Sequence, residues 1–149
     1  MFLRVCFVGV LALSLAGCSL WPSASHRISS VSTDDAREAA ALISAYRKAN
    51  GLSELAVDPQ LNRAAEHQAR AVAQAGQLSH GNFAARMGQY GITGFSAENL
   101  TAGPSTVAQA VARWKASPSH NENLLLPEAR TIGLARADSD SRSGTGHWC

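Results

Sequence analysis

The apolar positions of this 149-residue chain recur first at helical spacing. After capping and acidic residues at 32–38, apolar side chains repeat every three or four positions, at Ala39, Leu42, Ile43 and Tyr46. Asn50-Gly51 ends this run, which predicts a first helix. A second helix is predicted from Pro59 to about Ala75, with Asp58 as its N-cap.

Two further helices are expected before residue 120. Residues 82–89 predict a short third helix that ends by Gly91. Ser105-Thr106 caps a fourth, whose apolar stripe is formed by Val107, Ala110, Val111 and Trp114. Pro118 is expected to end this helix.

Strand signals are fewer and shorter. They fall at residues 95–100, at residues 131–137 and, after a polar turn, at His147-Trp148. The mixture predicts an α+β domain in which about four helices pack on a small sheet. The last strand is expected to be truncated, because the chain ends at Cys149 directly after the aromatic pair.

The first residues have the pattern of an export signal. One positive charge, Arg4, precedes an apolar run that is too short to span a membrane, and the segment closes with Leu15-Ala16-Gly17-Cys18. This closing sequence resembles a bacterial lipobox, in which cleavage before the cysteine leaves its thiol for lipidation. The alternative is an ordinary signal, because Ser14-Leu15-Ala16 also suits a general signal peptidase.

These features predict three parts of the chain. Residues 1–17 form a lipoprotein signal peptide, residues 18–32 a flexible Ser-rich tether, and residues 33–149 the folded domain. Acyl chains such as palmitate on Cys18 would hold the protein at a membrane. Ser19 after the cysteine favours the outer membrane in a Gram-negative cell, by resemblance to lipoprotein sorting signals.

Composition narrows the classes of partner. Hydrophobic residues make up 46% of the chain and charged residues 16%, which is typical of a globular protein. The formal charge of +2 is spread without a basic run, so we expect no nucleic-acid partner. Three cysteines, one of them the lipidation site, provide no disulfide framework, and we expect a monomer.

The familiar catalytic motifs are absent from the sequence, but a set of polar residues stands out between residues 79 and 125. The set comprises Ser79-His80, Glu98-Asn99-Leu100, Trp114-x-x-Ser117 and Ser119-His120-x-x-Asn123-Leu124-Leu125. With Arg47-x-x-Asn50-Gly51-Leu52-x-x-Leu55 and Ile132-Gly133-Leu134-Ala135, it resembles the CAP superfamily of cysteine-rich secretory, antigen 5 and pathogenesis-related proteins. The resemblance extends over about residues 36–148.

The resemblance implies a three-layer α-β-α sandwich around a cleft with two histidines and two glutamates. His80, Glu98 and His120 match three of these positions, and Ser117 stands at the fourth, where the family has a glutamate. Asn99 and Asn123 are expected to brace loops, and Trp114 to lie in the core. Without a second carboxylate, a mechanism that needs two acids is in doubt.

Two interpretations of the cleft remain open. Two imidazoles and one carboxylate suit Zn²⁺ or another divalent metal, with His80, His120 and Glu98 as ligands. Alternatively, these residues form a buried polar clamp that satisfies loop backbone groups. The separations along the chain, 18 and 22 residues, are too long to be a local metal signature.

Three functions are compatible with these residues. The first is an exported, lipid-anchored binding module for a small apolar, lipid, glycan or protein ligand at the cell envelope. The second is a metal-dependent hydrolase that uses the His/Glu cleft. The third is a structural envelope protein with an inert cleft. We expect a binding protein rather than an enzyme, because the sequence shows no nucleophile beside a base.

Overall fold

The computed structural model describes residues 25–140 and 147–148. Its elements, in chain order, are β1 (Ile28–Ser32), α1 (Ala36–Ala49), β2 (Ala56–Val57), α2 (Pro59–Ala75), α3 (Phe83–Gln89), β3 (Thr101–Ala102), α4 (Val107–Ala116), α5 (Pro118–Leu124), β4 (Thr131–Ile132), β5 (Arg136–Ser139) and β6 (His147–Trp148).

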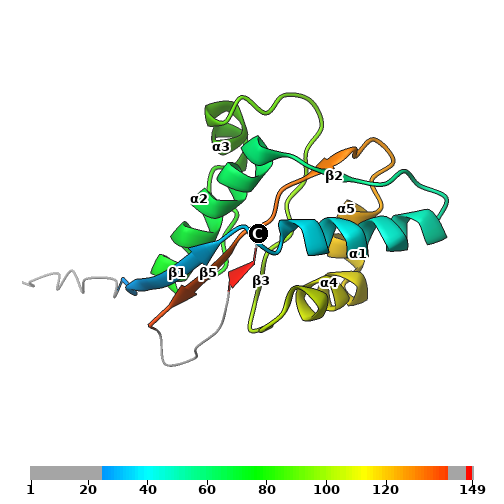
Figure 1. Cartoon of the computed structure of the whole chain (residues 1–149). Helices are drawn as coiled ribbons and strands as arrows, with labels where there is room; N and C mark the ends of the chain where they lie inside the picture. The colour runs from blue at the N-terminus through cyan, green and yellow to red at the C-terminus, as the bar shows by residue number, and fades with distance from the viewer. Residues whose placement is uncertain (1–24, 141–146, 149) are drawn as a thin grey trace, which may run out of the picture.

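A four-stranded antiparallel sheet in the order β1-β5-β6-β3 forms the middle layer. Helix α2 lies on one side of this sheet, and α1, α4 and α5 lie on the other (Figure 1). A second, two-stranded parallel sheet joins β2 to β4. This is the predicted α+β three-layer sandwich.

Helices α2 to α4 begin at residues whose side chains cap them, whereas Asp35, at the start of α1, makes no side-chain capping hydrogen bond. The Asp58 carboxylate accepts hydrogen bonds from the first backbone N–H groups of α2, and Gly76 closes α2 in the left-handed conformation that favours glycine. Asn82 and Thr106 cap α3 and α4 in the same way. Local hydrogen-bonding chemistry therefore fixes most helix boundaries.

The sequence predicts only that Pro118 ends α4, but this residue also begins a fifth helix, α5. Proline at the first helical position loses no hydrogen bond, because that N–H has no intrahelical partner in any helix. The prediction of about four helices misses α5 because a single proline can both stop one helix and start the next. With α5, the described residues contain five helices.

Two strand boundaries differ from the prediction. Residues 95–100 form a loop, and the strand β3 begins only at Thr101. Phe95, which contributed to the apolar signal, is 75% exposed. The run 131–137 is divided into β4 and β5, which belong to different sheets.

The expected tether also needs correction at its end. Its last five residues form β1, which pairs with β5 at the edge of the main sheet. Ile28 and Val31 pack against the α2 side of the core, and Ser30 Oγ donates a 2.7 Å hydrogen bond to Asp138. Serine-rich edge strands carry little apolar periodicity, which is why the sequence pattern predicts a tether here instead of a strand.

The core has one apolar cluster on each side of the main sheet. One cluster joins α1, α4 and α5 through residues such as Ile43, Val111 and Trp114. The other joins α2 to the sheet through Val72, Ala137 and several alanines of α2. The small alanine side chains let α2 approach the strands closely.

Candidate functional site

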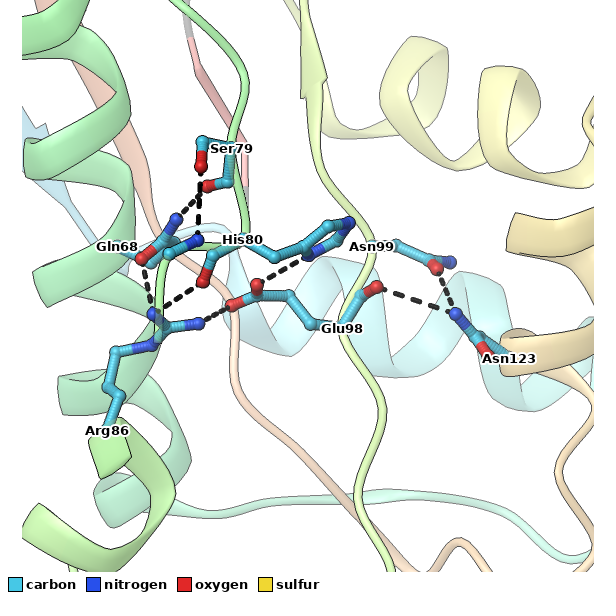
Figure 2. A network of polar contacts seen from close by, with 8 residues as sticks. Gln68, Ser79, His80, Arg86, Glu98, Asn99 and Asn123 are labelled. Atoms are coloured by element: carbon cyan, nitrogen blue, oxygen red, sulfur yellow. Dashed lines mark hydrogen bonds and ion pairs between the residues drawn. The ribbon is translucent and has the colours of Figure 1, made fainter. Parts of the chain in front are cut away.

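The carboxylate of Glu98 lies between two positively charged or protonatable side chains. His80 Nδ1 donates to Glu98 Oε1 at 2.8 Å, and Arg86 forms an ion pair with Glu98 Oε2 (Figure 2). The side chain of His80 is 56% exposed, whereas that of Glu98 is only 10% exposed. With Nδ1 donating, a neutral His80 keeps Nε2 as a hydrogen-bond acceptor.

Arg86 is the buried centre of this network, and the sequence pattern does not predict it. Its guanidinium donates to the Gln68 side chain and, at 3.1 Å, to the carbonyl of His80. Gln68 in turn donates to the carbonyl of Ser79, so α2, α3 and the loop between them are joined (Figure 2). An arginine in a short helix usually faces solvent, and no local sequence signal marks this one as buried.

Ser117 and His120 form a second pair, at the beginning of α5. Ser117 Oγ and His120 Nδ1 are joined by a 2.8 Å hydrogen bond. This contact places a hydroxyl beside an imidazole, but within the described residues no carboxylate is bonded to the His120 ring to orient it as a base. We therefore assign the pair to the stability of the first turn of α5.

Asn99 and Asn123 link the Glu98 network to the Ser117–His120 pair, and both were expected to brace loops. Asn99 Nδ2 donates to the carbonyl of His120 at 2.9 Å, and Asn123 Nδ2 donates to Asn99 Oδ1 at 2.9 Å. Asn123 also reaches the carbonyl of Glu98 at 3.4 Å (Figure 2). The loop that carries Glu98 is thereby held against α5.

This arrangement does not fit the three-ligand metal set. In residues 25–140 and 147–148, no three His, Cys, Asp or Glu side chains lie close enough together to hold a metal ion. Both oxygens of Glu98 have partners, and one of the partners is a buried guanidinium that would repel a divalent cation. The described geometry instead resembles the alternative, a polar clamp.

A cavity of about 310 Å³ lies beside Glu98 and extends between the helices. Its wall is formed by residues of α1 to α5, by Leu55, by the loop 92–99 and by the segment 126–134, which includes β4. Slightly more than half of the wall surface is apolar. Its apolar residues include Leu61, Phe83, Met87, Trp114, Leu124 and Ile132, and its polar residues include Thr93, Ser96, Glu98, Glu128 and Arg130. Of the four expected cleft residues, Glu98 lines the cavity, whereas His80, Ser117 and His120 lie outside its wall. The expected supporting residues Asn99, Trp114 and Asn123 also line it.

Arg47 holds one side of this cavity in place. Its guanidinium is fully buried and donates only to backbone carbonyls, those of Ser53, Leu124, Leu126 and Ala129, at 2.8 to 3.1 Å. Burial, and then the nearby charge of Arg130, lower the pKa of Arg47 from its ordinary value. The segment that follows α5 is thus attached to the end of α1.

The expected anchor, Cys18, and the signal peptide lie outside the described residues, as does Cys149. Within the described part, no helix combines the length and apolar character needed to cross a membrane. The lipid anchor therefore stays a prediction.

A family model described as the cysteine-rich secretory protein family, CAP, matches residues 40–149. The chain belongs to this family, as its motifs indicated. No curated protein matches the chain.

Two solved structures have a similar fold. An outer surface protein from Borrelia burgdorferi is 22% identical, with a TM-score of 0.70 over 83% of this chain and 93% of that protein. An extracellular protein containing a SCP domain from Bacillus anthracis is 20% identical, with a TM-score of 0.64 over 75% of this chain and 38% of that one. At these identities the likeness concerns the fold alone.

Proposed function

We propose that this CAP domain binds a small, largely apolar molecule in the cavity beside Glu98, at the cell envelope after export. The observation that carries the proposal is the cavity itself, about 310 Å³ with walls that are slightly more apolar than polar. Cavities of this size and lining are typical of small-molecule sites. An apolar ligand would gain free energy by leaving water for this wall.

The contacts around the cavity favour a preformed site. Arg47 holds the segment 124–129, and Asn99 and Asn123 hold the Glu98 loop against α5. A ligand would therefore spend little free energy on ordering these walls. Such rigidity is useful to a binding module and unnecessary for an inert envelope protein.

Two lines of argument support the proposed location. The first 18 residues have the pattern of a lipoprotein signal. The similar structures come from an outer surface protein and an extracellular protein. Anchoring through Cys18 would keep the cavity at the membrane surface, where apolar molecules are concentrated. Metabolic labelling with a palmitate analogue tests this point, because Cys18→Ser should abolish the label.

Binding can be tested with the neutral fluorescent probe N-phenyl-1-naphthylamine. Ala64 is buried and lines the cavity, whereas Ala71, on the same helix, is exposed. We expect Ala64→Leu to fill part of the cavity and weaken probe binding about tenfold, and Ala71→Leu to leave it unchanged. Equal probe affinity in the wild type and both variants would show that the cavity is not the binding site.

A further inference from the structure

We propose that the outer face of α2 lies against the membrane, where its arginines contact the phosphate groups of anionic phospholipids. This inference rests on the proposed function in one respect, the anchoring of the chain through Cys18. It does not depend on the ligand cavity. It assigns a partner to a face of the domain that the proposed function leaves unused.

The outer face of α2 carries a stripe of polar side chains along an open hollow of about 470 Å³. Arg63, His67, Arg70 and Gln74 line this hollow and are all exposed. Their intervals of four, three and four residues place them on one side of the helix. Tyr90, which follows α3, also lines the hollow, and its hydroxyl lies 3.2 Å from His67 Nδ1.

The balance of charge on this face is positive. Its one acidic residue, Glu66, is paired with Arg70 at 2.7 Å, and the side chain of Arg70 nevertheless stays 53% exposed. The guanidinium of Arg63 donates to the neutral side chain of Gln60 and has no carboxylate partner in the described part of the chain. Guanidinium groups that remain accessible in this way suit phosphate oxygens, which they bind through charge-assisted hydrogen bonds.

The chain leaves the described fold beside this face. His26 N donates to the carbonyl of Gln74 at 2.8 Å, and the His26 ring lies directly over Gly76, the residue that closes α2. From there β1 continues alongside α2 (Figure 1). The segment that leads back to the predicted anchor therefore begins at one end of the stripe.

The length of that segment brings the stripe within reach of the bilayer. Eight residues separate Cys18 from His26, and even fully extended they span no more than about 28 Å. The stripe from Arg63 to Gln74 is about 16 Å long, because each helical residue adds about 1.5 Å. A tethered face also meets the membrane at a high effective concentration, so a few charges are enough to orient it. An anion free in solution has no such advantage, which favours the lipid surface as the partner.

A thiol-accessibility experiment tests the orientation. The full-length chain lipidated at Cys18, with Cys149→Ser as background, is inserted into preformed vesicles of phosphatidylcholine, with or without phosphatidylglycerol. Ala71→Cys places a thiol in the hollow of α2, and Ala41→Cys places one on the exposed side of α1, in the other helical layer. The rate of modification by a neutral polyethylene glycol maleimide is followed by the shift in electrophoretic mobility.

We expect phosphatidylglycerol to slow the reaction of Ala71→Cys about 10-fold and that of Ala41→Cys by less than about twofold. Because each arginine near an anionic surface contributes about fivefold, Arg63→Gln together with Arg70→Gln should remove most of this protection. Arg37→Gln, which removes an exposed arginine of α1, is the matched control and should leave the protection unchanged.

The outcomes separate the inference from the proposed function. Equal rates for the two thiols, protection that is as strong without phosphatidylglycerol, or protection that survives loss of both arginines overturns the inference alone. A chain that carries no lipid and does not stay with the vesicles overturns the inference and the proposed anchoring together. Binding of N-phenyl-1-naphthylamine to the same protein then decides separately whether the cavity binds a ligand.

Discussion

At the scale of single residues, two buried arginines organise the molecule. Arg47 belongs to a motif that carried the family resemblance, and the structure gives the physical reason for it. Its planar guanidinium donates to four backbone carbonyls that lie outside the β-sheets. They belong to Ser53, Leu124, Leu126 and Ala129. Arg86 instead joins one backbone carbonyl, that of His80, to the side chains of Gln68 and Glu98.

Arg47→Lys tests the first of these arginines. A lysine keeps the charge but cannot place donors in a flat fork toward carbonyls on several sides. We expect a loss of about 2 to 3 kcal/mol in the free energy of unfolding, measured with urea. Arg37→Lys, at an exposed position of the same helix, is the control and should change stability by less than about 0.5 kcal/mol.

Arg86 and Glu98 are suited to a double-mutant cycle. Both side chains are largely buried, so removal of either one leaves an uncompensated charge. We expect Arg86→Met to cost about 3 kcal/mol and the double variant Arg86→Met, Glu98→Gln to cost less than the sum of the two single changes. Additive losses in urea unfolding would show that the two charges are not coupled.

The residue scale also shows how far the candidate site could be predicted. The sequence singled out His80 and Glu98, which the structure brings into contact, because histidine and glutamate carry recognisable chemistry. It could not single out Arg86, since an arginine in a seven-residue helix has no local feature that marks burial. It also placed His120 in one cluster with His80, whereas its ring bonds to Ser117.

At the scale of elements, helix-capping residues and close backbone contacts between segments decide the architecture. Helices α1 to α4 could be predicted because their ends are encoded by neighbouring residues. The strands were predicted less well: β6 lies at His147–Trp148 as expected, but β2 was missed and β3 and β4, also two residues long, differ from the predicted runs. Such short strands are defined by their partners across the sheet, which sequence periodicity does not reveal.

Gly133 shows how one such element is positioned. A Cβ at this residue would lie 2.1 Å from the backbone carbon of Leu61, in the first turn of α2. The segment between β4 and β5 therefore touches α2 directly, and Leu134 N donates to Asn62 Oδ1 at 3.0 Å. Only glycine permits this backbone contact.

Gly133→Ala should consequently separate α2 from this segment. We expect a loss of at least about 3 kcal/mol in unfolding free energy, because backbone atoms on both sides would have to move. Gly88→Ala is the matched control, since its Cβ would meet no atom within 4 Å and alanine favours a helix by about 1 kcal/mol. A Gly133→Ala protein as stable as the wild type would contradict the contact.

At the scale of the whole molecule, the cavity is a product of the assembled layers. Its wall includes residues of five helices, of β4 and of the loops beside them, and no local motif contains more than a few of them. The sequence predicted a cleft only through resemblance to a family. The position of the hollow relative to Glu98, and its mixed lining of apolar and polar residues, follow from packing and could not be read from periodicity.

Because residues from all these segments line one cavity, a ligand should stabilise the entire fold rather than one region. A ligand at ten times its dissociation constant adds about 1.4 kcal/mol to the free energy of unfolding if it binds only the folded state. We expect N-phenyl-1-naphthylamine to raise the unfolding temperature of the wild type and of Ala71→Leu by several degrees at that concentration. Ala64→Leu should show a much smaller rise at the same probe concentration, because the added side chain occupies the same space as the probe. A full rise in Ala64→Leu would place the bound molecule elsewhere on the domain, since the cavity could not then be the site whose occupation opposes unfolding.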